Sequence, residues 1–133
     1  MKQIIKQKTM NEINTLTVIA GTMIVLDYVY LNSFSKYFKK VFKEIQGQEI
    51  EVKLPSAVAV YIIMVFAMYY FGFIVKLKEI EMALLGFIIY SVYEFTNHAT
   101  INSWPLWMIA VDSLWGAALF FIVFKLTKKL IKN

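Results

Sequence analysis

The chain has 133 residues, of which 59% are hydrophobic and 17% aromatic, and its formal net charge is +5. The charges are gathered into short stretches with long uncharged runs between them, which is the distribution that a lipid bilayer selects. All 14 basic residues are lysines, and this argues against nucleic-acid binding, which favours arginine and a continuous basic face. Because cysteine is absent, the sequence excludes disulfides, thiolate nucleophiles and thiolate metal ligands.

The first apolar run covers residues 16–31 and follows three lysines, so it predicts a membrane-spanning helix at 14–32. A secretory signal peptide is the alternative, because it also combines a basic start with a short apolar stretch. Asp27 interrupts the apolar stretch, and no small-residue cleavage site follows it. The spanning helix is therefore the favoured interpretation.

Residues 33–46 alternate aromatic and aliphatic side chains with lysines at the spacing of one helix face. The apolar members are Phe34, Tyr37, Phe38, Val41, Phe42 and Ile45. This pattern predicts an amphipathic helix that lies in the headgroup plane of the membrane, with its ammonium groups in water. The alternative is a solvent-exposed helix that packs on the rest of its own protein.

Three further runs predict spanning helices at residues 54–75, 80–98 and 104–125. The run at 54–75 holds 22 uncharged residues, more than the hydrocarbon core of about 30 Å requires at a rise of about 1.5 Å per residue. Trp104 and Trp107 are expected to anchor the last helix at the membrane interface. The predicted fold class is all-α, a single domain (1–133) forming a four-transmembrane-helix bundle with an amphipathic interfacial helix between the first and second spans.

The distribution of lysines predicts the orientation of this bundle. The amino terminus, the second connection and the carboxyl terminus hold nine lysines together, against five in the first connection and none in the third. Positive residues favour the cytoplasmic side of a membrane. We therefore expect a multi-pass integral membrane protein with both termini in the cytoplasm.

Three acidic residues, Asp27, Glu94 and Asp112, lie inside the predicted spans. Successive spans run in opposite directions, and this places all three acids in the same, non-cytoplasmic half of the bilayer. Acidic residues within spans mark polar sites in the bundle interior. The sequence therefore predicts one shared carboxylate pocket.

Neighbouring side chains extend the predicted pocket. Tyr90 and Asn97 share a helix face with Glu94, His98 stands at the mouth of that helix, and Trp115 shares a face with Asp112. The predicted ligand-binding residues are Asp27, Tyr90, Glu94, Asn97, His98, Asp112 and Trp115. No catalytic residue and no cofactor follows from the pattern.

No lysine or arginine lies within any predicted span, so the charge state of the acids is the central question. An unpaired buried carboxylate is costly. Either some of the acids carry a proton, or a metal ion, a cationic ligand or water neutralises them. Asp27, Glu94, His98 and Asp112 supply ligands that suit a hard metal ion, although their spacing matches no metal-binding signature. The other interpretation is that protonated acids join the helices through hydrogen bonds.

Several of these residues fall in recognisable motifs. The sequence YEFTNHAT occupies residues 93–100, Trp-Pro-Leu occupies 104–106, and Val-Asp occupies 111–112 with Trp-Gly at 115–116. Together with Leu-Asp at 26–27 and Tyr-Leu at 30–31, they resemble a family of small membrane proteins, the domain of unknown function 2177. The resemblance implies a four-helix bundle of unknown activity, found in bacteria and in some large DNA viruses. It also implies a bacterial inner membrane or a viral or host membrane as the location.

Two functions remain open at this point. The first is an intramembrane pocket that binds a proton, a cation or a small polar ligand and serves transport or a membrane-embedded reaction, for which a homo-oligomer is expected. The second is a non-enzymatic structural or assembly component of a cell or virion membrane, in which residues 33–46 and the lysine-rich ends dock a partner. The lipid bilayer is a partner in both, and nucleic acid in neither.

Overall fold

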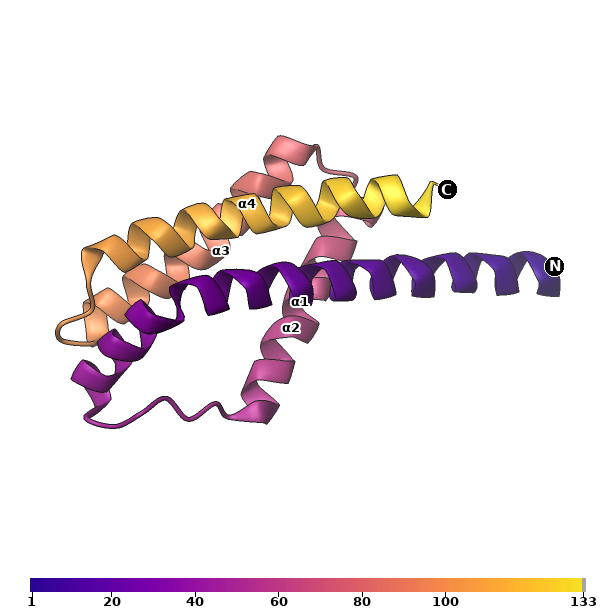
Figure 1. Ribbon diagram of the computed structural model, residues 1–133. Helices are drawn as coiled ribbons and strands as arrows, with labels where there is room; N and C mark the ends of the chain where they lie inside the picture. The colour runs from indigo at the N-terminus through magenta and orange to yellow at the C-terminus, as the bar shows by residue number, and fades with distance from the viewer. Residues whose placement is uncertain (133) are drawn as a thin grey trace.

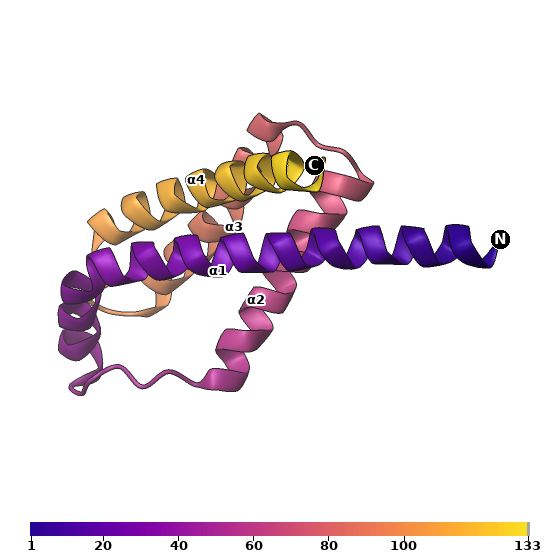
Figure 2. The ribbon, with the colours of Figure 1, turned by 45° about the vertical axis from the view of Figure 1, so that its right-hand side comes forward.

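The structure, a computed structural model, describes residues 1–132 as four α-helices and one short π-helix (Figure 1). In chain order the elements are α1 (Lys2–Gln46), α2 (Leu54–Tyr69), η1 (Tyr70–Ile74), α3 (Glu79–Thr100) and α4 (Leu106–Ile131). Figures 1 and 2 show both ends of the chain at the same end of the molecule, and the 47–53 and 101–105 connections at the opposite end. The all-α fold class is thereby confirmed.

Three helical segments are long and apolar enough to cross a membrane: α1, the continuous helix Leu54–Ile74 formed by α2 and η1, and α4. The helix α3 has 22 residues, which is about 33 Å at a rise of about 1.5 Å per residue. The polar side chains in its last turns lower its hydropathy. Its place as a fourth span stays a prediction.

The helix α1 is longer than the sequence pattern predicts. The structure has no helix boundary after Asn32, and α1 continues to Gln46, where Gly47 ends it in the left-handed conformation (φ 70°). No proline or glycine lies between residues 22 and 46 to end the helix earlier. The last turns of α1 bend away from its main axis (Figures 1 and 2).

The bent end of α1 packs its apolar face on the protein itself. Phe38 is buried in a cluster with Trp104 and Met108, and the rings of Phe42 and Trp104 meet edge to face at 5.7 Å. Trp104 is 5% exposed, so its expected place as a membrane-interface anchor is wrong. These contacts match the packed-helix interpretation of residues 33–46, and the headgroup-plane position stays a prediction.

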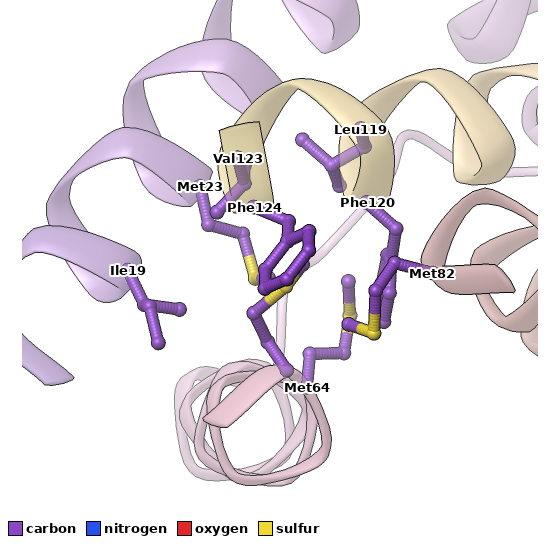
Figure 3. Close-up of a cluster of buried hydrophobic side chains, with 9 residues drawn as sticks. Ile19, Met23, Met64, Met82, Leu119, Phe120, Val123 and Phe124 are labelled. Carbon is purple, nitrogen blue, oxygen red and sulfur yellow. The ribbon is translucent and has the colours of Figure 1, made fainter. Parts of the chain in front are cut away.

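The main core lies between the acids and the chain termini, and all four α-helices contribute to it (Figure 3). Methionines supply much of its volume, and these flexible side chains fill irregular gaps between helices. The buried members are Ile19, Met23, Met64, Met68, Met82, Leu119, Phe120, Val123 and Phe124. Apolar packing therefore holds the four helices together in this part of the molecule.

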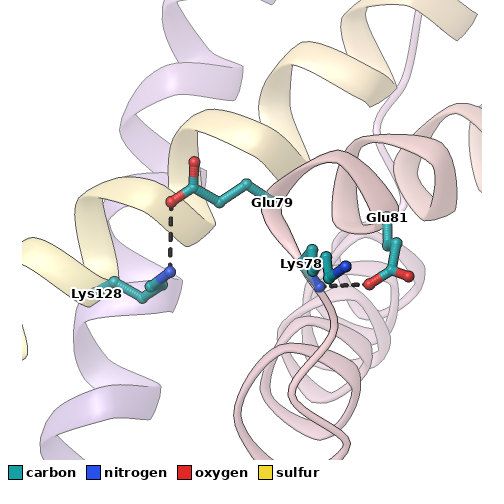
Figure 4. Close-up of polar contacts among 4 residues, drawn as sticks. All are labelled: Lys78, Glu79, Glu81 and Lys128. Carbon is teal, nitrogen blue, oxygen red and sulfur yellow. Dashed lines mark hydrogen bonds and ion pairs between the residues drawn. The ribbon is translucent and has the colours of Figure 1, made fainter.

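The closest helix pair is α3 with α4. A Cβ atom on Gly86 would lie 2.1 Å from the carbonyl oxygen of Gly116, so the two backbones touch at this point. At the end near the termini, the Glu79 carboxylate pairs with the Lys128 ammonium group at 3.3 Å (Figure 4). The Lys78 backbone N–H also donates to Glu81 at 2.6 Å and caps the start of α3. The two helices are therefore held together as one rigid unit.

The contact between Gly86 and Gly116 is testable by adding one methyl group. We expect Gly86→Ala to lower the free energy of unfolding in detergent micelles by about 1–3 kcal/mol, because the helix backbones must separate. The matched control is Gly21→Ala in α1, where an added Cβ meets nothing within 4 Å. That variant should be neutral or more stable by up to about 1 kcal/mol. Equal destabilisation by both substitutions would contradict the close backbone contact.

Candidate functional site

The helices α1 and α4 meet through two reciprocal hydrogen bonds. Asp27 and Tyr30 stand three residues apart on α1, and Asp112 and Trp115 stand three apart on α4, so each pair shares a helix face. The Tyr30 hydroxyl donates to Asp112, and the Trp115 indole N–H donates to Asp27 at 3.0 Å. The two aromatic rings stack with centroids 4.4 Å apart and planes 6° apart. The acid of each helix is thus held by the aromatic residue of the other.

Asp27 also connects α1 to α2. The Tyr61 hydroxyl donates to Oδ2 of Asp27, while Trp115 uses Oδ1. Each oxygen of this carboxylate therefore has a donor from a different helix. Hydrogen bonds of this kind link helices to one another.

Glu94 on α3 is bonded differently. Its side chain is 0% exposed, and the Trp104 indole N–H donates to Oε2 at 2.7 Å. Among residues 1–132, the other oxygen, Oε1, has no hydrogen-bond partner. Asp112 lines the same cavity as Glu94. A carboxylate can only accept hydrogen bonds, so a proton or a cation is needed to supply what this oxygen lacks.

The three acids line one cavity of about 650 Å³, together with Tyr90. Its volume falls within the range of about 300–1,000 Å³ that is usual for small-molecule sites. Most of its wall is apolar and comes from all four α-helices; it includes Leu31, Phe38, Val60, Ile63, Ile89 and Met108. Lys39 from the bent end of α1 also reaches the wall, and it is exposed.

The structure brings Asp27, Tyr90, Glu94 and Asp112 to the cavity wall, and it places Trp115 against Asp27. Asn97 and His98 do not line the cavity, and His98 is exposed in the last turn of α3. His98 is about 6 Å further along the helix than Glu94, since each residue adds about 1.5 Å. Within residues 1–132 no group of three or more acids and histidines is arranged to hold a metal ion, so the predicted ligand set with His98 is not assembled.

The sequence analysis did not assign four residues of the site to the pocket: Tyr30, Tyr61, Trp104 and Lys39. The position of Tyr30, three residues after Asp27, parallels that of Trp115 after Asp112, and this repeated spacing is a usable signal. Tyr61 and Trp104 have no such signal, because their partners lie on other helices. Lys39 reaches the cavity because α1 continues beyond Asn32 and bends.

The long apolar helices, with many large apolar side chains on their outer surface, define a helical membrane protein. A family profile described as "Predicted membrane protein (DUF2177)" matches residues 13–127, and the chain belongs to this family. The resemblance seen in the sequence motifs is thereby confirmed. Comparison with curated proteins and with solved structures gave no match.

The reciprocal contact between α1 and α4 predicts a specific pattern of stability changes. We expect Tyr30→Phe and Trp115→Phe each to lower the free energy of unfolding by about 0.5–3 kcal/mol, because each leaves a carboxylate without one donor while keeping an aromatic ring. Combining both substitutions in a double-mutant cycle should show coupling between them, since the two rings stack. Tyr28→Phe, at an exposed position of the same helix, is the control and should change nothing. Additive effects would show that the two bonds act independently.

Proposed function

We propose that this protein is a four-span membrane protein whose carboxylate-lined cavity binds a proton, a cation or a small polar ligand, and that a cationic group fits this cavity best. The observation that carries the proposal is the unpartnered, fully buried Oε1 of Glu94, beside Asp112 on the wall of the cavity. A positively charged group with N–H donors supplies what these acceptors lack.

The membrane placement of α3 and the orientation belong to this proposal. Large apolar side chains of α3 point away from the protein, including Leu84, Ile88 and Val92, and a bilayer would cover them. Both termini lie at one end of the molecule, as an even number of spans requires (Figure 1). With the lysine-rich termini in the cytoplasm, the cavity opens in the outer half of the membrane.

The three acids have different parts in the proposed site. Both oxygens of Asp27 already accept hydrogen bonds, so this residue positions α1, α2 and α4. Glu94 has a free oxygen, and Asp112 has one oxygen that Tyr30 does not use. The ligand therefore binds between Glu94 and Asp112, while Trp104 and Tyr30 hold the two carboxyl groups in place.

The preference for a cation over a proton alone rests on volume. One proton shared between Glu94 and Asp112 would satisfy both carboxyl groups, but a cavity of about 650 Å³ would then have no occupant of its own.

The other candidate function is a structural or assembly component of a cell or viral membrane. The observation that favours it is that both oxygens of Asp27 accept hydrogen bonds from other helices, so this acid links the helices.

The proposal is tested with ethanolamine, a small water-soluble ammonium ion, added to the purified protein in a neutral detergent. We expect calorimetric titration to show binding that Glu94→Gln and Asp112→Asn each weaken about tenfold or more, since a charged hydrogen bond is worth about 1.5–3 kcal/mol. Asp27→Asn should chiefly lower the melting temperature. Glu12→Gln, near the other end of α1, is the matched acidic control.

Two results would count against this proposal. The first is that the wild-type protein binds no ammonium ion, neither ethanolamine nor a long-chain amine. The second is that Glu94→Gln and Asp112→Asn variants, shown by thermal melting to be folded, bind such an ion as well as the wild type does. Either result would favour the structural function.

A further inference from the structure

We infer that the ligand of this cavity is a membrane amphiphile with an ammonium head group, which enters from the bilayer between α1 and α2. This inference rests on the proposed function and names the class of ligand. It is carried by three observations: the apolar wall of the cavity, the exposure of part of that wall on the outer surface of spanning helices, and the position of the unpartnered carboxyl oxygen.

The wall of the cavity extends onto the outer surface of the protein. Leu31 of α1 is 46% exposed, and Val60 and Ile63 of α2 are 52% and 66% exposed, although all three line the cavity. Both helices are long and apolar enough to cross a membrane, so lipid chains rather than water face these side chains. The cavity is therefore continuous with the lipid phase at this point.

The N-terminal turns of α2 and the connection that precedes them border the cavity. Figures 1 and 2 both show these turns diverging from α1 toward the 47–53 connection, and Ile50 and Val52 of that connection line the cavity. Further along α2, Met64 and Met68 hold it against the common core. A ligand can thus enter past the start of α2 and its preceding connection while the packed core stays together.

The acids on the wall of the cavity define the head group. Glu94 and Asp112 both line the cavity, and the free oxygen of Glu94 is buried. An ammonium group that reaches Glu94 and Asp112 donates several hydrogen bonds and compensates their charge. The chain of an amphiphile lies along the apolar wall, which a small water-soluble cation does not contact.

Two sources of such a ligand are a phospholipid with an ammonium head and a simple long-chain amine. Lys39 distinguishes them, because it lines the cavity from the exposed side, where a phosphate group would pair with it. For a simple amine Lys39 supplies only repulsion. The shared chemistry is an ammonium head with an apolar chain.

The test compares probes that share a head group or a chain, by calorimetric titration of the whole protein in neutral detergent. The probes are ethanolamine, lysophosphatidylethanolamine, dodecylammonium, and lysophosphatidic acid, which has the phosphate and chain but no ammonium group. We expect lysophosphatidylethanolamine or dodecylammonium to bind about tenfold or more tightly than ethanolamine, because their chains make packing contacts with the apolar wall that ethanolamine cannot make. Lysophosphatidic acid should bind at least about tenfold more weakly than the better of the two ammonium amphiphiles, because it has no ammonium group to donate a charged hydrogen bond to the acids.

A pair of matched variants tests the apolar wall. Ile63→Trp puts a bulky side chain at the entrance and should weaken binding of the amphiphile about tenfold more than it weakens binding of ethanolamine. Ile80→Trp in α3 is the control, since Ile80 is 70% exposed and does not line the cavity. Leu31→Trp is a second entrance variant if Ile63→Trp fails to fold.

Lys39→Gln distinguishes the two sources of the ligand. It should weaken the binding of lysophosphatidylethanolamine if the ligand is a phospholipid. It should leave the binding of dodecylammonium unchanged or strengthen it if the ligand is a simple amine.

The outcomes separate this inference from the proposed function. If ethanolamine binds as tightly as the amphiphiles, or if folded entrance variants bind the amphiphiles normally, the inference is wrong while the cation site stands. Equal binding of lysophosphatidic acid would show that the ammonium group is not recognised and would also overturn the inference. If none of the ammonium probes binds, the proposed function itself fails.

Discussion

The crossed contact between α1 and α4 is the constraint on which the rest of the site depends. Tyr30 donates to Asp112, Trp115 donates to Asp27, and the two rings stack between the bonds. Within a bilayer, helices gain little from the hydrophobic effect on association, so hydrogen bonds and close packing decide how they sit together. A carboxylate left without donors there would be costly. The reciprocal pairs therefore set the register of α1 against α4, while the close approach of α3 to α4 at Gly86 and Gly116 brings Glu94 to the same cavity as Asp112.

The helices are packed differently along their length. The methionine-rich core and the touching backbones at Gly86 and Gly116 hold them closely together. Toward the end opposite the termini, α2 diverges and a cavity of about 650 Å³ lies against the acids. The packed part of the molecule therefore supports the part that contains the acids.

The bend in α1 joins the outer segment of that helix to the site. If α1 ended at Asn32, residues 33–46 would be free to leave the bundle. Because the helix continues, Phe38 is buried against Trp104, and Trp104 in turn donates to Glu94. Lys39 is brought to the cavity wall by the same turn of helix. Residues 33–46 thus support the Glu94 carboxyl group through Trp104, and they bring one lysine to the cavity wall.

The sequence by itself determined the helical class, three spanning segments, the three acids and the family, because hydropathy and helical periodicity are local properties of the chain. The spacing of Asp112 and Trp115 even indicated a shared face. Only the tertiary structure decided that Tyr61 and Trp104 are donors to the acids, that α1 continues past Asn32, and that His98 lies away from the cavity. These features depend on how helices rotate and bend against one another, and that geometry is set by contacts between residues far apart in the chain.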